Sequence, residues 1–235
     1  MVFNSIFFIF CFLPVFMLIS YLVPGKLRNL LLFLGSLVFY AWGEPVYVIL
    51  MLFSSVFNYY MGTELERLYY DDRKQKINLI FSIVVNLFIL VFFKYYGFLL
   101  NTIGGITGIH IPHPELALPI GLSFYTFRNL SYLFDIYLSK INAQRNFLTF
   151  AVYSTMFPYT SAGPIIRYAD IEEQLTHRSL NVSRFGLGAE LFVKGLAKKV
   201  LLADSLSALY AGICGHSQMS VFTAWIGILA YTMQL

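Results

Sequence analysis

Long apolar runs follow one another along most of this chain, and they limit it to a small set of folds. The first run covers residues 2–23, and about 20 apolar residues are enough to cross the hydrocarbon core of a bilayer. Charged residues make up only 12% of the 235 residues, about half the share found in soluble domains. Because helices satisfy their own backbone hydrogen bonds in lipid, the chain is predicted to be all-α, a polytopic bundle of transmembrane helices.

Further runs continue this pattern. Residues 30–42 form a second, short candidate span, and residues 45–61 form a third with Pro45 in its first turn, where proline is well tolerated. Residues 77–100 form a fourth. A last apolar run covers residues 221–235 and reaches the end of the sequence without a polar tail, so we expect the chain to be truncated.

Basic residues fall in alternate connections between these spans. The first connection carries Lys26 and Arg28, and the third carries four basic residues within 67–76, whereas the connections at 43–45 and 101–119 carry no lysine or arginine. Positively charged loops stay on the cytoplasmic side of a membrane. The pattern therefore predicts a multi-pass protein of the cell membrane with its N-terminus outside.

Residues 118–175 differ from the rest because they place charges beside apolar runs. A helix starting near Gly121 would present one polar face, opposite a face with Thr126, Leu130, Leu133 and Tyr137; the polar face comprises Tyr125, Arg128, Ser131, Tyr132, Asp135 and Ser139. A charge at bilayer depth costs roughly 2.5–3.5 kcal/mol on insertion scales. These side chains must therefore border a substrate cavity or form a buried charge network between helices, and the pattern leaves both interpretations open.

The stretch that follows indicates a re-entrant segment. Residues 147–157 are too few to span a bilayer, and a hairpin that enters and leaves on one side would keep Arg145 and Arg167 cytoplasmic. Gly163-Pro164 turns the chain, and residues 165–175 are typical of a short amphipathic helix at the interface.

Residues 184–210 allow two interpretations. Glu190 and Lys194 are four apart in the favourable order, with Lys198 one turn further, which indicates a helix based at the cytoplasmic headgroups. A basic site for the phosphates of a nucleotide-type donor is the rival interpretation. The basic residues form no continuous face, so no nucleic-acid partner is predicted.

The histidines predict no metal site. His110 and His113 flank Pro112 in a loop, and two histidines without a third ligand make a poor zinc site. His177 and His216 lie in polar or glycine-rich connections. None of them meets the requirements of a general base for attack by a hydroxyl group.

Four stretches occur in an order that resembles a known family. They are FYAWGEP (39–45), LPIGLSFYTFRNLSYLFDIY (118–137), AGPIIRYADIEEQL (162–175) and GLAKKVLLAD (195–204). Together they resemble the membrane-bound O-acyltransferases, above all the membrane subunits of bacterial alginate O-acetyltransferases. The resemblance covers the whole chain and implies that residues 1–235 are the N-terminal part of a single membrane domain, a helical bundle with re-entrant segments around a tunnel.

The resemblance also implies an activity. It implies transfer of an acyl group, with acetyl-CoA as the expected cytoplasmic donor and no bound cofactor, to hydroxyls of an extracytoplasmic polysaccharide in a bacterial inner membrane. Extracytoplasmic acyltransferase partner proteins and the lipid bilayer are the implied partners. The essential histidine of the family is expected beyond Leu235, so the chain should hold no catalytic residue and be inactive alone. The expected tunnel residues are Tyr125, Arg128, Tyr132, Asp135 and Arg167.

Three other functions stay open on the sequence. The chain is also similar, more distantly, to teichoic-acid D-alanyl transfer proteins. Buried charges and broken helices suit a transporter, although the two halves of the chain show no convincing internal repeat. A non-catalytic membrane scaffold is the third alternative. Which acyl group moves, and to which polymer, is not encoded in any of these patterns.

Overall fold

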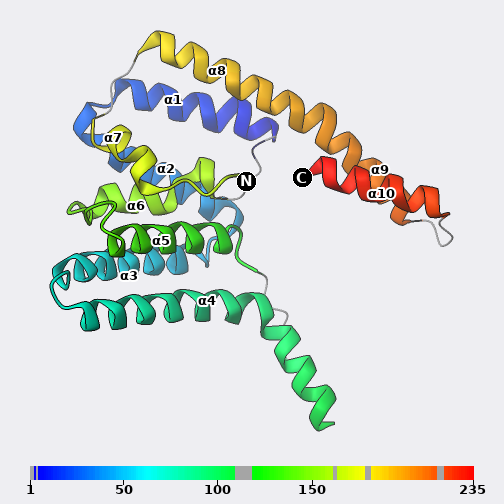
Figure 1. The fold of residues 1–235 in the computed structure, drawn as a ribbon. Coiled ribbons are helices and arrows are strands. Elements are labelled where there is room, and N and C mark those ends of the chain that lie inside the picture. The colour runs from blue at the N-terminus through cyan, green and yellow to red at the C-terminus, as the bar shows by residue number, and fades with distance from the viewer. Residues whose placement is uncertain (1–2, 4, 109–117, 161–162, 178–180, 216–219) are drawn as a thin grey trace. The chain divides into compact units, whose positions relative to one another are not determined.

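The computed structural model describes residues 3, 5–108, 118–160, 163–177, 181–215 and 220–235, and all regular structure within these residues is helical (Figure 1). The all-α prediction is therefore confirmed. The chain divides into two compact units, of which the first holds residues 22–178 and the second holds residues 2–21 and 179–235. Each unit is described by itself.

The first unit is a bundle built around one helix. Helix α5 (Leu122–Tyr137) packs against α3, α4 and α6. The other helices of the unit are α2 (Arg28–Gly43), α3 (Val48–Arg67), α4 (Asp72–Thr107), α6 (Phe147–Thr155) and α7 (Tyr168–Thr176), with short 3-10 turns η2 (Gly25–Leu27) and η3 (Phe157–Tyr159). Each apolar run predicted within this unit contributes a helix.

One predicted helix start is wrong. Pro45 does not begin α3, because residues 45–47 form a turn and the helix starts at Val48. Tyr47 is the N-cap residue, and its carbonyl accepts the first helical hydrogen bond from Met51 N at 3.1 Å. Pro45 has no N–H to donate, so it fits the turn before the helix as well as the first helical turn.

Helix α4 is long and apolar enough to cross a membrane, and it is the one helix among the described residues that meets both criteria. Its 36 residues correspond to about 54 Å at 1.5 Å per residue, well beyond the roughly 30 Å of a hydrocarbon core. Asp71 caps its start by accepting from Lys74 N at 3.1 Å, and the hydrogen bonds from Lys74 lower the pKa of Asp71. The polytopic arrangement and the re-entrant segment stay predictions.

The interior of the first unit has two apolar clusters. The larger one centres on four aromatic rings whose centroids lie 4.7–6.2 Å apart, those of Tyr132, Phe150, Tyr153 and Tyr168. Gly62 of α3 lets α5 approach closely, because a Cβ at this position would lie 2.7 Å from the Tyr132 ring. The smaller cluster consists of Tyr40, Met51, Leu90, Leu122 and Tyr125.

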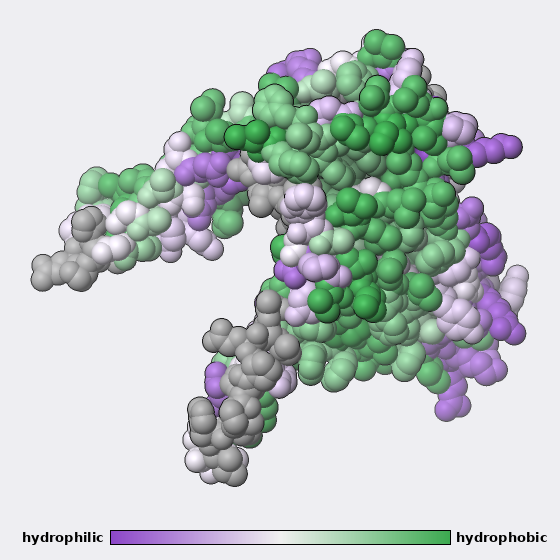
Figure 2. All heavy atoms as spheres, turned by 180° about the vertical axis from the view of Figure 1, so that it is seen from behind, coloured by the Kyte–Doolittle hydropathy of each residue, from purple (hydrophilic) through white to green (hydrophobic). Residues whose placement is uncertain are grey.

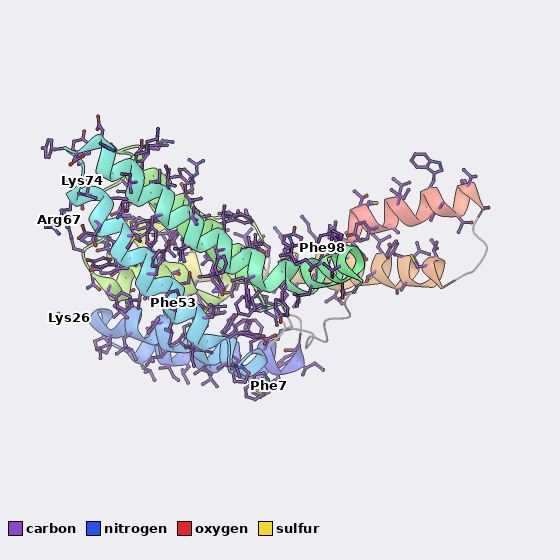
Figure 3. All side chains as sticks on the ribbon, turned by 90° about the horizontal axis from the view of Figure 1, so that it is seen from below. Phe7, Lys26, Phe53, Arg67, Lys74 and Phe98 are labelled. Carbon is purple, nitrogen blue, oxygen red and sulfur yellow. The ribbon has the colours of Figure 1, made fainter. Side chains whose placement is uncertain are left out.

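The basic connections of the first unit lie at one end. Figure 3 shows Lys26, Arg67 and Lys74 together at that end, and Phe98 of α4 at the other. Figure 2 shows a broad hydrophobic surface with hydrophilic residues gathered in separate patches beside it. The side of a membrane on which these connections lie stays a prediction.

The second unit consists of long helical segments. A π-helical turn η1 (Phe8–Phe12) leads into α1 (Leu13–Leu22), and α8 (Val182–Ala197), η4 (Lys198–Ala203) and α9 (Asp204–Cys214) follow one another without a break. Helix α10 (Val221–Gln234) packs back against α9, where the rings of Tyr210 and Tyr231 lie 5.1 Å apart. The predicted helix over 184–210 is therefore longer than expected and changes to π-helical geometry within its length.

Candidate functional site

Most of the predicted polar face of α5 is buried, and so is most of the face opposite it, but Ser139 is exposed and lies in a turn beyond the end of the helix at Tyr137. Arg128, Tyr132 and Asp135 are 2%, 0% and 6% exposed, and the opposite residues Leu130 and Leu133 are 7% and 0% exposed. The helix is thus enclosed by its neighbours on nearly all sides. Burial on both faces fits the position of α5 between α3, α4 and α6, and the choice between a cavity wall and a buried network stays open.

Arg128 is held by backbone carbonyl groups. Its Nη1 donates to the carbonyl of Tyr153 at 2.8 Å and reaches that of Ser154 at 3.5 Å, and its Nη2 donates to the carbonyl of Tyr159. The last carbonyls of a helix lack intrahelical partners and carry partial negative charge. The guanidinium therefore caps α6, and among the described residues no carboxylate forms an ion pair with it.

Tyr153 connects α6 to two other parts of the chain. Its hydroxyl donates to the carbonyl of Arg128 at 3.1 Å and to the carbonyl of Ile166 at 3.2 Å. Ser131 Oγ lies 3.5 Å from the same hydroxyl. The Arg128 guanidinium also lies 6.0 Å from the centroid of the Tyr153 ring, a distance at which a cation is attracted to an aromatic face.

Asp135 lies close enough to Tyr153 to act electrostatically on its hydroxyl. Its carboxylate makes no hydrogen bond or ion pair with a described residue. Arg128 and Asp135, which lie two helical turns apart, therefore both interact with the same tyrosine. The bridge between them that the sequence suggested stays a prediction, because Tyr153 hydrogen-bonds the Arg128 carbonyl but no contact of its side chain with the Asp135 carboxylate is found among the described residues.

Tyr132 and Tyr125 belong to different clusters. The hydroxyl of Tyr132 accepts from Gln144 N at 2.9 Å, and Gln144 Nε2 donates to the hydroxyl of Tyr168 at 2.5 Å. Tyr125 instead belongs to the smaller apolar cluster with Tyr40, and both hydroxyls are buried without a hydrogen-bond partner among the described residues. The structure thus gathers Arg128, Tyr132 and Asp135 around Tyr153 but places Tyr125 elsewhere.

Arg167 differs from the other predicted site residues because it is exposed. It is the N-cap residue of α7, in extended conformation, and its side chain does not cap the helix. No described carboxylate forms an ion pair with it. A guanidinium in this setting is available to a carboxylate or phosphate, the groups that its planar donors match best.

A buried amide network was missed by the sequence interpretation. Asn58 of α3 and Asn86 of α4 exchange two side-chain hydrogen bonds, of 3.1 and 2.8 Å. Asn129 of α5 donates to Ser54 of α3 at 3.1 Å, and its own Oδ1 is buried without a partner. The available signal was the presence of asparagine in the middle of apolar runs, because a polar group at such depth needs a partner.

Of the four histidines, His177 alone lies among the described residues. His177 is exposed, with Nδ1 3.1 Å from Thr176 Oγ1, and His110, His113 and His216 lie outside the described residues. No cluster of three or more metal-binding side chains occurs among the residues that the structure describes. In the second unit, Lys194 pairs with Glu190 at 2.5 Å and Lys199 pairs with Asp204, whereas Lys198 is exposed and forms no ion pair.

Comparison with curated proteins gives matches over the whole chain. A probable alginate O-acetylase AlgI of Pseudomonas aeruginosa is 38% identical over 239 residues, which is 100% of this chain and 46% of the relative. The protein of the same name in Azotobacter vinelandii is 37% identical over 239 residues, 100% of this chain and 48% of the relative. The chain is a relative of the alginate O-acetylases. The resemblance found in its four motifs is therefore confirmed.

A third relative carries a different name. The peptidoglycan O-acetyltransferase of Helicobacter pylori is 30% identical over 269 residues, 100% of this chain and 51% of the relative. The chain spans about half the length of the curated relatives it matches. No family model matches the chain, and no solved structure gives a significant match.

Proposed function

We propose that this chain is part of a membrane O-acetyltransferase that modifies hydroxyl groups of an extracytoplasmic polysaccharide. The observation that carries the proposal is the match of every part of the chain to relatives named for O-acetylation of two different polysaccharides, alginate and peptidoglycan. These names favour acetyl transfer over the alternatives of D-alanyl transfer, transport or scaffolding.

The proposed reaction moves the acetyl group from a cytoplasmic thioester, acetyl-CoA, to an acceptor hydroxyl. The hydroxyl oxygen attacks the acetyl carbonyl carbon, a C–O bond forms, the C–S bond breaks, and the thiolate leaves. A base must take the hydroxyl proton. The chain matches about half the length of its relatives, so the base is expected in the half of those relatives that it does not match, and residues 1–235 alone are expected to be inactive.

The membrane setting of the proposal is a multi-pass protein of the bacterial inner membrane with its N-terminus outside. Two features support it. Helix α4 is long and apolar enough to span, and the basic connections of the first unit lie at one end (Figure 3), as expected for the cytoplasmic side. In this orientation the residues around Tyr153 contribute to the wall of a substrate path, and partner proteins outside the membrane receive the acetyl group.

The proposal is tested in membranes of cells that make the protein from its natural locus. Acetyl-CoA labelled in the acetyl group is supplied on the cytoplasmic side, and label in the polysaccharide fraction is measured against a strain that lacks the gene. Label should depend on the gene. Equal label in both strains would exclude the proposed activity.

Arg167 supplies a residue-level test. Replacement of Arg167 by alanine removes an exposed guanidinium that holds no other side chain in place, so the amount of protein in the membrane should not change. If Arg167 binds an anionic part of a substrate, transfer should fall by about tenfold or more, since hydrogen bonds to charged groups contribute about 1.5–3 kcal/mol. Unchanged transfer at unchanged abundance would remove Arg167 from the substrate path.

A further inference from the structure

The segment that joins α6 to α7 is described at residues 156–160 and 163–167, and its first part contacts two helices, α2 and α5. Phe157 N donates to Ser36 Oγ of α2 at 3.1 Å, and the Tyr159 carbonyl accepts from Arg128 of α5. The Thr160 carbonyl packs so closely on Gly121, at the start of α5, that a Cβ there would lie 2.1 Å from it.

The described end of the segment is fixed by one side chain. The carbonyl of Ile166 accepts from Tyr153 Oη at 3.2 Å, and Tyr153 is in turn tied to α5 through the carbonyl of Arg128. These contacts are made by backbone groups of the segment, and in its first part the side chains of Phe157 and Thr160 are buried as well. Ile165 is 49% exposed, and Gly163, Pro164 and Arg167 are exposed as well.

The role of Arg128 follows from the same contacts. Both terminal nitrogens of its guanidinium already donate to carbonyls at the end of α6 and in η3, and the residue is 2% exposed. A substrate would have to displace these carbonyls to reach it. Arg128 therefore holds the backbone at the end of α6 and in η3.

We infer that Tyr153 and Arg128 are positioning residues, which fix residues 163–167 so that Arg167 meets an anionic group of a substrate. The chemistry of that group is a carboxylate or a phosphate, because either matches the planar donors of a guanidinium. The carboxylate would belong to the polysaccharide and the phosphate to the acetyl donor. The claim that Arg167 binds an anionic substrate group rests on the proposed function. The claim that Tyr153 and Arg128 fix residues 163–167 rests on the structure alone.

The positional part is tested by replacing Tyr153 with phenylalanine. Phenylalanine keeps the ring contacts with Tyr132, Phe150 and Tyr168 and removes only the hydroxyl. The matched control is Tyr59→Phe, because Tyr59 also contacts Phe150 and its hydroxyl donates to a single backbone carbonyl, that of Arg145, at 2.7 Å. Tyr153 thus binds the carbonyl of Ile166, the residue before Arg167, and Tyr59 binds the carbonyl of Arg145 itself.

Trypsin cleaves after arginine, so cleavage reports on each segment separately. The protein is placed in lipid nanodiscs, and the rates of cutting after Arg167 and after Arg145 are measured by mass spectrometry. Tyr153→Phe should accelerate cutting after Arg167 about fivefold, the factor that corresponds to one hydrogen bond, and should leave Arg145 unchanged. Tyr59→Phe should show the reverse pattern. Equal acceleration at both sites in both variants, or no change after Arg167 in Tyr153→Phe, would overturn the inference.

The substrate part is tested by acetyl transfer with the concentrations of acetyl donor and polysaccharide varied in turn. Tyr153→Phe and Arg167→Ala should raise the KM of the same substrate, with kcat changed less than twofold in Tyr153→Phe. A raised KM for the polysaccharide identifies the carboxylate, and a raised KM for the donor identifies the phosphate. A fall in kcat with both KM values unchanged would contradict the inference that Tyr153 positions Arg167 to bind a substrate. If the protein made from its natural locus transfers no acetyl group in membranes, the proposed function fails, whereas the trypsin pattern still decides the positional role.

Discussion

The two units of the molecule differ in what they bury. The first unit encloses polar side chains between its helices, among them Asn58, Asn86 and Arg128, which are 0–3% exposed. In the second unit α8 buries no side chain, and the buried apolar residues of that unit are few: Phe8, Phe16, Ile213 and Ala230. Yet both units are built from similarly apolar sequence.

The difference teaches that apolar composition alone does not bring these helices together. In lipid, an apolar side chain is as well placed against an acyl chain as against another helix, so helices associate through close packing at small residues and through interhelical hydrogen bonds. The first unit has both, at Gly62 and at the Asn58–Asn86 pair. The second unit forms its two ion pairs within one continuous helical stretch, so these pairs connect no helices.

The largest expected effect is at Gly121. Its φ is +73° and a Cβ would lie 2.1 Å from the Thr160 carbonyl. Gly121→Ala should lower the free energy of unfolding by about 3 kcal/mol, from the strained backbone and the overlap together. The measurement is thermal unfolding of the protein in detergent micelles, followed by circular dichroism.

Two glycines serve as controls for that prediction. Gly108 has a similar φ of +71° with nothing within 4 Å, so Gly108→Ala should cost only about 1–2 kcal/mol. Gly188 of the second unit lies inside α8 with nothing within 4 Å, and alanine there should stabilise by about 0.5–1 kcal/mol. If Gly188→Ala lowered the free energy of unfolding as much as Gly121→Ala, the two units would not differ in how closely their helices pack.

The second prediction concerns the amide pair. Asn58→Leu or Asn86→Leu alone leaves the remaining amide buried without its partner and should cost about 2 kcal/mol. The double variant should cost less than the sum, with a coupling energy of about 1 kcal/mol, within the range measured for hydrogen bonds between membrane helices. The double-mutant cycle is measured by the same unfolding experiment, and additive losses would show that the pair does not join α3 to α4.

The success of the sequence interpretation depended on local signals. The apolar runs in the sequence predicted that helices α2, α3, α4, α5 and α10 exist, because the length and hydropathy of a run are local properties. The start of α3 was misplaced, since Pro45 suits both a turn and a first helical turn. The π-helical turn at 198–203 was not predicted, because no residue type marks it.

The candidate site was harder to predict because its contacts join distant residues through the backbone. Arg128 binds carbonyls 25 and 31 residues away, and a carbonyl is present at every position, so the sequence gives no sign of the partner. Charges at membrane depth predicted that Arg128 and Asp135 are enclosed. They could not predict that Tyr153, an unremarked residue in an apolar run, interacts with both.

The smallest expected effect is at the ion pair of the second unit. Lys199 and Asp204 are five residues apart, which an α-helix would place about 140° from each other, but the π-helical turn η4 has i→i+5 geometry and brings them onto one face. Their side chains are 53% and 40% exposed, so water and salt screen the pair.

Lys199→Gln should therefore lower the free energy of unfolding by less than about 1 kcal/mol, and the loss should shrink further at high salt. Lys198→Gln is the matched control, because Lys198 is the adjacent exposed lysine without an ion pair, and it should change nothing. The unfolding experiment used for the first unit measures both. A loss of 2 kcal/mol or more at Lys199 alone would mean that the second unit, like the first, depends on specific polar contacts, and that exposure is a poor guide to which helices are held in place.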